Sequence, residues 1–562
     1  MWLRVGLLAL CLTTFVVGLG ESAIRDYDEA YYAEAGREMA ASGDWVTPHY
    51  NFEPRLQKPV LYYWLVAGTY KVFGVTEWGA RIWSALAGVG LALLAFAVGR
   101  RWSNEPTGAI AGAIVATSFG LVPIARQSLP DVPLAFFVSV ATWAIIEATA
   151  LQAPLRHDGV RRVQRARRRW VMLAGMATGL GALTKGPVAL VLPALVMGPI
   201  LLWEWRSRPS NAPRPFPLSP RDVMLLAAVV VTVALPWYLA VINARGIGYV
   251  REFFVGENLD RFATSRYNEW RGWDYVPVVI GGLLPWSVFG LLWLRPLGDL
   301  LRRRRVVEAV DVRLLAWAGT PLLFFFVSVG SQPRYILPCL VPLAILLART
   351  MAARLRTSDP AFGATSALAG VVILLFGVLL VRAKPLLEAV NISGSAAGPW
   401  VVVIAGLVVM GSAVVLSRRF VPVAIAIGAA VSLVAFDRSA MIPGRPEAVE
   451  VIAQAALSNR PGPVICACGA FARSLNFYTH LETRIVDTEN EAEEVRLFLD
   501  TPDRVLAVVD SKALATVERR MGRTFLTLAT VEYLNTTVWQ RPAFLWRPDP
   551  SAVQRVVLVS NR

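Results

Sequence analysis

The sequence predicts a polytopic α-helical membrane protein with a large first outer loop and a small C-terminal α/β domain. Of its 562 residues, 55% are hydrophobic and 17% are charged, whereas about a quarter of the residues of an ordinary soluble protein are charged. Long apolar runs recur along most of the chain, and the composition becomes polar beyond them. We therefore expect a transmembrane domain over residues 1–437 and a second domain over residues 438–562.

The chain begins with the apolar run MWLRVGLLALCLTTFVVGLG. Arg4 precedes its apolar stretch, as in a signal peptide, but no small-x-small cleavage site stands before Glu21. Because many further apolar runs follow, we interpret this segment as a retained signal anchor.

Apolar runs of spanning length follow one another up to residue 437. A helix needs about 20 mostly apolar residues to cross the hydrocarbon core of a bilayer, and about thirteen stretches satisfy this condition. The expected spans lie near residues 3–20, 80–99, 107–124, 132–151, 170–186, 188–205, 223–242, 274–294, 313–330, 335–351, 365–382, 399–417 and 420–437.

The basic residues predict the orientation of these spans. Short cytoplasmic loops collect Lys and Arg, and an N-terminus inside the cell places every strong basic cluster in the cytoplasm. These clusters lie at residues 156–170, 205–222, 295–313 and 417–419. The same clustering explains the net charge of +16 better than nucleic-acid binding, because the basic residues stand between apolar runs.

This orientation brings four loops and the C-terminal part to the outer face. The loops are 21–78, the short loop around 125–131, 244–275 and 331–335. An odd number of spans places residues 438–562 on the same face. There, strand-like runs such as PVICAC and RVVLVS alternate with helical patterns such as SKALATVERRM, which predicts a small α/β domain. The chain has four cysteines, too few and too scattered for a disulfide framework or a zinc cluster.

The acidic stretch RDYDEAYYAE, residues 25–34, follows the first apolar run. A helix from Tyr27 to Met39 is expected, with Asp26 as its N-cap and Glu29 reaching back as in a capping box. Asp28 and Glu29 also suit the positive end of the helix dipole. A purely structural role for these acids and a catalytic role both remain open at this point.

Several cations are expected on the same outer face as these acids. Lys58 lies in the first loop, Lys185 and Arg334 end or begin spans, and a second acid, Asp131, also stands at the outer end of a span. Arg261 lies in the loop 244–275. Each cation alone could simply extend to the membrane surface. Four cations with two aspartates on one face indicate a site for a lipid phosphate and a neutral nucleophile.

The order of several motifs resembles that in the bacterial aminoarabinose lipid A transferases. These are membrane glycosyltransferases of the GT-C fold and are related to the protein O-mannosyltransferases. The resemblance extends over nearly the whole chain, and its strength lies in the order and spacing of the motifs together. The motifs are Asp28-Glu29 with Tyr32-Ala33-Glu34, Gly43-Asp44-Trp45-Val46-Thr47-Pro48, Lys58-Pro59, Asp131, Lys185-Gly186-Pro187, Pro236-Trp237-Tyr238, Arg261-Phe262 and Tyr335-Ile336-Leu337-Pro338.

The resemblance implies that Asp28 and Asp131 line the transfer site. It further implies that Lys58, Arg261 and Tyr335 hold the phosphate of the carrier lipid. To these we add Glu29, Lys185 and Arg334 as expected substrate-binding residues. No cofactor is expected, since a lipid phosphate is the leaving group and no convincing nucleotide-binding motif is present.

One departure from the family pattern concerns a metal ion. In the family, a glutamate in the first loop and a histidine in a later loop can share a metal, and this chain has Gln57 and Asn258 at those places. A neutral amide is a poor metal ligand in either position, so we predict no metal there. The loss also leaves the identity of the sugar open.

We therefore predict an inverting, metal-independent transfer of a sugar from undecaprenyl or another polyprenyl phosphate to lipid A. The sugar is 4-amino-4-deoxy-L-arabinose or a similar pentose or hexose. A transferase acting on protein, lipopolysaccharide core or cell-wall polysaccharide is the alternative, and a non-catalytic transporter is a further one. The resemblance places the protein in the bacterial inner membrane, with the site and the C-terminal domain in the periplasm, and we expect a monomer that contacts membrane lipids.

Overall fold

The computed structural model describes most of the chain. The described residues are 2–26, 28–150, 157–207, 218–260, 272–294, 298, 308–329, 332–357, 359–390, 392, 396–442, 444–459, 464–468, 470–486, 491–534 and 546–562.

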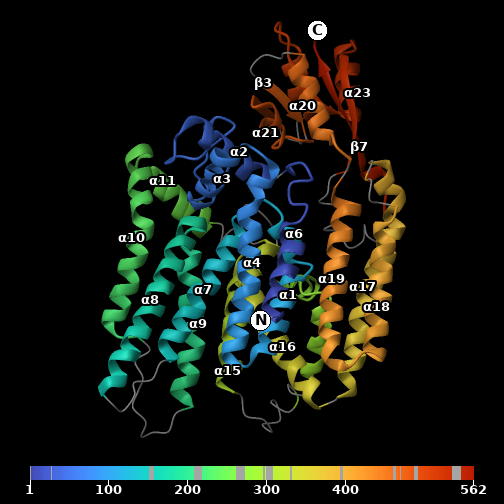
Figure 1. The fold of residues 1–562 in the computed structure, drawn as a ribbon. Coiled ribbons are helices and arrows are strands. Elements are labelled where there is room, and N and C mark those ends of the chain that lie inside the picture. The colour runs from blue at the N-terminus through green and yellow to red at the C-terminus, as the bar shows by residue number, and fades with distance from the viewer. Residues whose placement is uncertain are drawn as a thin grey trace.

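Long apolar helices form an upright bundle, and a mixed α/β domain lies at one end of it, which we call the domain end (Figure 1). Within the described ranges, nine helices are long and apolar enough to cross a membrane, by length and composition. They are α4 (Glu77–Trp102), α7 (Asp131–Ala150), α9 (Val188–Arg206), α10 (Pro220–Arg245), α15 (Ala309–Val327), η5 with α16 (Pro333–Thr357), α17 (Pro360–Ala389), α18 (Gly398–Val415) and η7 through η8 around α19 (Arg418–Met441). The predicted multi-pass architecture is confirmed.

One further pair of apolar helices is bent rather than straight. The helices of residues Gly272–Gly282 and Trp286–Trp293 are together long and apolar enough to cross a membrane. The chain bends by 112° between them. Three further predicted spans correspond to helices outside the nine. They are α1 (Trp2–Cys11) with η1 (Leu12–Val16), α5 (Glu105–Ala116), and α8 (His157–Lys185), which begins in a run of arginines. The count of about thirteen spans therefore stays a prediction.

Small residues allow the helices of the bundle to approach closely. A Cβ atom placed on Gly406 in α18 would lie 2.4 Å from the backbone nitrogen of Leu374 in α17. Glycine at such a contact lets two helix backbones pack side by side, which is the usual way in which helices associate in a bilayer.

The segment predicted as the first outer loop forms a compact layer at the domain end (Figure 1). It consists of α2 (Asp28–Ser42), the short strands β1 (His49–Tyr50) and β2 (Glu53–Pro54), and α3 (Leu61–Phe73). In the motif that begins at Gly43, the Asp44 carboxylate accepts hydrogen bonds from the backbone nitrogens of Val46 at 3.0 Å and Thr47 at 2.9 Å. This motif therefore has a local structural reason, which is a turn closed by an aspartate.

Helix α2 corrects two details of the predicted capping. Asp26 does not cap it, because its Oδ1 accepts hydrogen bonds from the backbone nitrogens of Arg473 and Ser474, both at 2.8 Å. Glu29 does reach back, but to the backbone nitrogen of Arg25 at 2.9 Å. Asp26 thus binds the C-terminal part of the chain, and Glu29 binds the backbone that precedes α2.

The C-terminal part contains a five-stranded sheet in the order β4-β3-β5-β7-β6. Strand β3 pairs in parallel with β4 and β5, and β7 pairs in antiparallel fashion with β5 and β6. Ile452, Leu506 and Leu558 belong to one apolar cluster and Val509, Val517 and Val559 to another, as expected for a sheet that carries helices on both faces. The elements are α20 (Ala448–Ser458), β3 (Val464–Cys468), α21 (Leu475–Thr479), β4 (Glu482–Val486), α22 (Glu491–Leu499), β5 (Leu506–Asp510), α23 (Ser511–Met521), β6 (Leu526–Leu534) and β7 (Val553–Ser560).

Candidate functional site

Four of the predicted site residues meet at the domain end of the bundle. Asp131 is the first residue of α7, and its Oδ1 lies 2.6 Å from Nζ of Lys185, the last residue of α8. The other oxygen of Asp131 lies 3.2 Å from Nε of Arg334, which follows α15 in the turn η5 (Pro333–Cys339). Arg334 also pairs with Asp28, at the start of α2. Four separate segments thus form one chain of alternating charges, which we call the ionic chain.

The four members of this ionic chain differ in exposure. The side chain of Asp131 is 4% exposed and that of Lys185 is 12% exposed. Arg334 is 23% exposed and Asp28 is 40% exposed. Asp131 therefore serves as a buried anchor for two cations, whereas Asp28 is the carboxylate that a substrate can reach.

Tyr335 lies beside the ionic chain with its aromatic ring against Lys185. Nζ of Lys185 lies 4.2 Å from the centroid of the Tyr335 ring, which is close enough for a cation–π contact. The ring also packs against Phe325, with the two centroids 5.4 Å apart. Tyr335 thus helps to fix the ammonium group of Lys185.

Lys58 forms a second ion pair in the same region. Its Nζ lies 2.9 Å from Oε2 of Glu257, in the π-helical turn η2 (Glu252–Asp260). Both side chains are largely buried, at 11% and 10% exposure. The charge of Lys58 acts on Asp131 as well, which places the pair within electrostatic range of the ionic chain.

The buried tyrosines Tyr32 and Tyr63 lie within electrostatic range of the ion-paired groups. Their ring centroids lie 5.5 Å apart. The charge of Asp28 acts on both phenols, and that of Glu257 acts on Tyr63. Burial raises the pKa of both side chains, so they stay neutral and can serve as hydrogen-bond donors.

Glu29 takes a different place from the one predicted. Its carboxylate is 1% exposed and lies 2.7 Å from Nε of Arg81 in α4, and it also accepts the backbone N–H of Ser128 at 2.9 Å. Burial opposes the ionisation of Glu29, and the Arg81 guanidinium outweighs it, so the pKa of Glu29 lies below its usual value. This geometry does not support a contact with substrate, because it fastens α2 to the bundle.

Two other predictions concern the metal and Arg261. Arg261 lies outside the described residues, so its predicted role stays a prediction. Gln57 is exposed, and Nδ2 of Asn258 donates to the backbone oxygen of Phe253 at 2.7 Å. Among the described residues, no group of three or more His, Cys, Asp or Glu side chains could hold a metal ion.

The structure adds two residues that sequence reasoning missed. Glu257 lies 199 positions from Lys58, and the spacing of the two gives no sign that they pair. Arg81 did carry a signal, since an arginine near the start of the apolar helix α4 requires a partner when it is buried. Nothing in the sequence pattern identified Glu29 as that partner.

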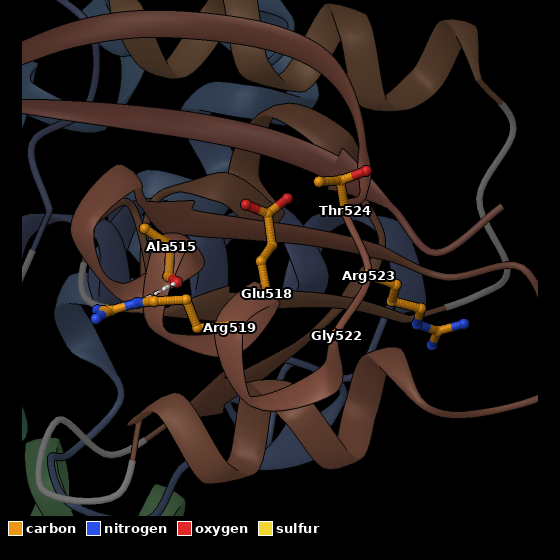
Figure 2. A pocket seen from close by; sticks show the side chains of 6 residues that line it. All are labelled: Ala515, Glu518, Arg519, Gly522, Arg523 and Thr524. Carbon is orange, nitrogen blue, oxygen red and sulfur yellow. Dashed lines mark hydrogen bonds between the residues drawn. The ribbon is translucent and has the colours of Figure 1, made fainter.

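A hollow elsewhere on the surface contains none of the predicted site residues. It lies at the end of α23 in the C-terminal domain and is lined by Ala515, Glu518, Arg519, Gly522, Arg523 and Thr524 (Figure 2). Its polar groups serve the local fold, since Nε of Arg519 donates to the Ala515 oxygen at 3.1 Å and Glu518 accepts from the Phe525 nitrogen at 3.0 Å.

The sequence is similar to known lipid-linked sugar transferases. Residues 2–244 match the family model described as dolichyl-phosphate-mannose-protein mannosyltransferase. A protein of Pseudomonas aeruginosa strain UCBPP-PA14, named undecaprenyl phosphate-alpha-4-amino-4-deoxy-L-arabinose arabinosyl transferase, is 37% identical over 352 residues. That alignment covers 61% of this chain and 59% of the relative. A relative from Pseudomonas fluorescens strain Pf0-1 has the same name with the number 2 added. It is 34% identical over 385 residues, which are 67% of this chain and 64% of the relative.

The chain thus spans about three fifths of the length of the curated relatives that it matches. The fold agrees over a longer range. The crystal structure of ArnT from Cupriavidus metallidurans bound to undecaprenyl phosphate matches with a TM-score of 0.72 and 22% identity, covering 100% of this chain and 98% of that one. The resemblance and the GT-C-like fold inferred from the motifs are confirmed.

Proposed function

We propose that this chain, a relative of the arabinosyl transferases in sequence and of ArnT in fold, is a membrane glycosyltransferase. It moves a sugar from undecaprenyl phosphate, or a similar polyprenyl phosphate, to lipid A at the periplasmic face of the bacterial inner membrane. The sugar is 4-amino-4-deoxy-L-arabinose or a similar pentose or hexose. The observation that carries this proposal is the ionic chain of Asp28, Arg334, Asp131 and Lys185, with the Lys58–Glu257 pair beside it.

The site has the charges that a lipid phosphate needs. Lys58, Lys185 and Arg334 are balanced by Asp28, Asp131 and Glu257 when no substrate is bound. A phosphate that enters the site therefore has to displace a carboxylate from one of these cations. Lys58 is suited to this exchange because its ammonium group reaches the Glu257 carboxylate from the flexible end of its side chain, whereas Lys185 is fixed between the buried Asp131 and the Tyr335 ring.

The reaction breaks the bond between the anomeric carbon and the phosphate oxygen. The phosphate leaves with the bonding electrons, and the surrounding cations stabilise the charge that builds on its oxygens. The acceptor oxygen forms the new bond from the opposite face of the sugar, which inverts the configuration. No step requires a metal ion or an organic cofactor.

Asp28 acts on the acceptor or on the sugar. If the acceptor is a hydroxyl group, its proton passes to the Asp28 carboxylate, which is the exposed acid of the site. If the acceptor is a lipid A phosphate, it is already ionised, and Asp28 orients the sugar and stabilises positive charge at the anomeric carbon. Asp131 holds Arg334 in place in both cases.

Mass spectrometry of the envelope tests this function. Lipid A from the host should carry a sugar that disappears when the gene is deleted and returns with the wild-type gene but not with Asp28→Asn. If the sugar is lost instead from protein, lipopolysaccharide core or wall polysaccharide, the protein is still a transferase, and that molecule rather than lipid A is the acceptor. An envelope unchanged in every fraction would contradict the proposal.

A further inference from the structure

The C-terminal domain binds the segment that carries Asp28. In the domain, a turn leads into α21, and Figure 1 shows α21 next to α2. The backbone nitrogens of Arg473 and Ser474 in this turn both donate to Oδ1 of Asp26 at 2.8 Å. Asp26 stands two residues before Asp28, so the domain holds the chain immediately before α2 begins.

The side chain of Arg473 binds the segment that follows Asp28. Its Nε donates to the hydroxyl oxygen of Tyr31 at 2.8 Å, and its guanidinium carbon lies 5.4 Å from the centroid of that ring. Tyr31 lies three residues after Asp28, in the first turn of α2. The backbone oxygen of Arg473 accepts a hydrogen bond from the Tyr50 hydroxyl at 3.1 Å, and Tyr50 packs on Tyr31 with the ring centroids 4.6 Å apart.

A second set of contacts secures the domain on the first loop. The side chain of Asn51 pairs with the backbone of Thr483 in both directions, donating to its oxygen at 2.9 Å and accepting from its nitrogen at 2.7 Å. The Tyr478 hydroxyl accepts the backbone N–H of Ile24 at 2.7 Å. Glu447 accepts that of Ala23 at 2.6 Å. The domain is therefore joined to the first loop before and after α2 by directional hydrogen bonds.

The polar character of this interface argues for a geometric role. Ser474 and Asn476 are buried at 1% and 0% exposure, in the same segment whose backbone nitrogens bind Asp26. Apolar contact alone would tolerate sliding, whereas hydrogen bonds to specific backbone atoms fix one register. A carboxylate that accepts two backbone N–H groups sets both the position and the direction of the segment that carries it.

From these contacts we infer that the C-terminal domain is part of the transfer site, and that Asp26 and Arg473 are positioning residues that set the start of α2 so that the Asp28 carboxylate meets Arg334. This inference rests on the proposed function and adds a task for the domain. Its residues do not need to touch the sugar, since they act through Asp26 and Tyr31 on the residues between them.

Two substitutions at position 26 separate positioning from charge. Asp26→Asn keeps a side-chain oxygen that can accept both backbone N–H groups, and it should retain kcat within about 3-fold. Asp26→Ala removes the acceptor, and kcat should fall by about 10- to 100-fold while KM for the polyprenyl donor changes little, because a small displacement of a reacting group costs about this much. Arg519→Ala, in the distant hollow of the same domain, serves as the matched control and should behave as wild type.

Hydrogen exchange of the full-length protein in detergent gives a readout that is independent of activity. Asp26→Ala should increase exchange at the amides of the first turns of α2, and Asp26→Asn and Arg519→Ala should not. If wild type transfers sugar and Asp26→Ala keeps its kcat, the inference is overturned. An equal loss of kcat in Asp26→Asn and Asp26→Ala would also overturn it, since the charge rather than the position would then matter.

The failure of the proposed function would look different. In that case wild type itself would transfer no sugar, while the exchange of α2 would still respond to Asp26→Ala, so the docking of the domain would stand without a catalytic meaning. A loss of activity that merely follows a fall in Tm, with unchanged kcat per folded molecule, would assign these contacts to stability and refute the positioning role.

Discussion

The Asp28 carboxylate forms an ion pair with the Arg334 guanidinium, although 306 residues separate the two in sequence. This pair joins the first outer loop to the bundle, and through Arg334 it connects to the buried Asp131. The exposed end of the ionic chain is the Asp28 carboxylate, and the cations Arg334 and Lys185 lie behind it on either side of the buried Asp131. An arrangement of this kind presents a carboxylate to the acceptor while keeping positive charge behind it for the leaving phosphate.

Asp28→Asn should lower kcat by about 100-fold or more, because the amide can neither take a proton nor supply a negative charge. Transfer from a polyprenyl-phosphate sugar to the acceptor, measured with purified protein, checks this expectation. The variant should retain the melting temperature of wild type within a few degrees, since Asp28 is the most exposed member of the ionic chain. Wild-type activity in this variant would remove Asp28 from the mechanism.

Lys58→Ala should raise KM for the polyprenyl donor or lower kcat by about 10-fold or more, since it removes one charge-assisted contact to the phosphate. Glu257→Gln is the matched variant, because it frees Lys58 from its acidic partner without removing the cation. It should leave KM for the donor equal to or below that of wild type. Unchanged kinetics in Lys58→Ala would exclude Lys58 from the phosphate pocket.

Arg81→Met should destabilise the protein by about 3 to 5 kcal/mol, because it leaves the Glu29 carboxylate buried without its cation. Chemical or thermal unfolding in detergent measures the loss. The double variant Glu29→Gln/Arg81→Met should recover part of it, since both charges of this pair are then removed. If the double variant is no more stable than Arg81→Met, the pair does not carry the attachment of α2.

Glu38 predicts a pH dependence of stability. Burial, with the nearby Glu34 carboxylate, raises the pKa of Glu38 to about 7, although the backbone N–H of Phe52 favours the ionised form. Between the ordinary pKa of a glutamate and about 7, the folded protein keeps a proton that the unfolded chain releases. The contribution of Glu38 to stability should therefore fall as the pH rises through this window and be constant above it.

A thermal melt series from pH 5 to pH 8 measures this dependence, at about 1.4 kcal/mol for each unit of pKa difference. Glu38→Gln cannot titrate, so its melting temperature should change less across the same range. A slope identical to that of wild type would show that another group is responsible.

Purified protein should contain no stoichiometric transition metal, and chelators should not lower its activity. Gln57 and Asn258 present neutral amides, and the Asn258 amide already donates to the Phe253 carbonyl. Elemental analysis by mass spectrometry checks this expectation. Gln57→Glu combined with Asn258→His supplies the comparison, and one tightly bound zinc in wild type would refute the prediction.

The sequence predicted most members of the candidate site but not the way in which they pair. Asp28, Asp131, Lys185 and Arg334 were assigned to one face from the distribution of basic loops alone, and the structure brings their charged groups together. Glu29 was assigned with them because it adjoins Asp28 in the sequence. A helix turns by about 100° per residue, so adjacent residues point in different directions, and Glu29 faces Arg81 instead.

The composition and the periodic apolar runs determined the membrane class and predicted an outer loop and a separate C-terminal part, because the thickness of the bilayer and the exclusion of charge act on each segment individually. Only the tertiary structure decided that Asp26 binds the C-terminal domain and that Lys58 pairs with Glu257. Such contacts join groups hundreds of residues apart, and their energy depends on distance and burial in the folded state. Local sequence carries neither quantity.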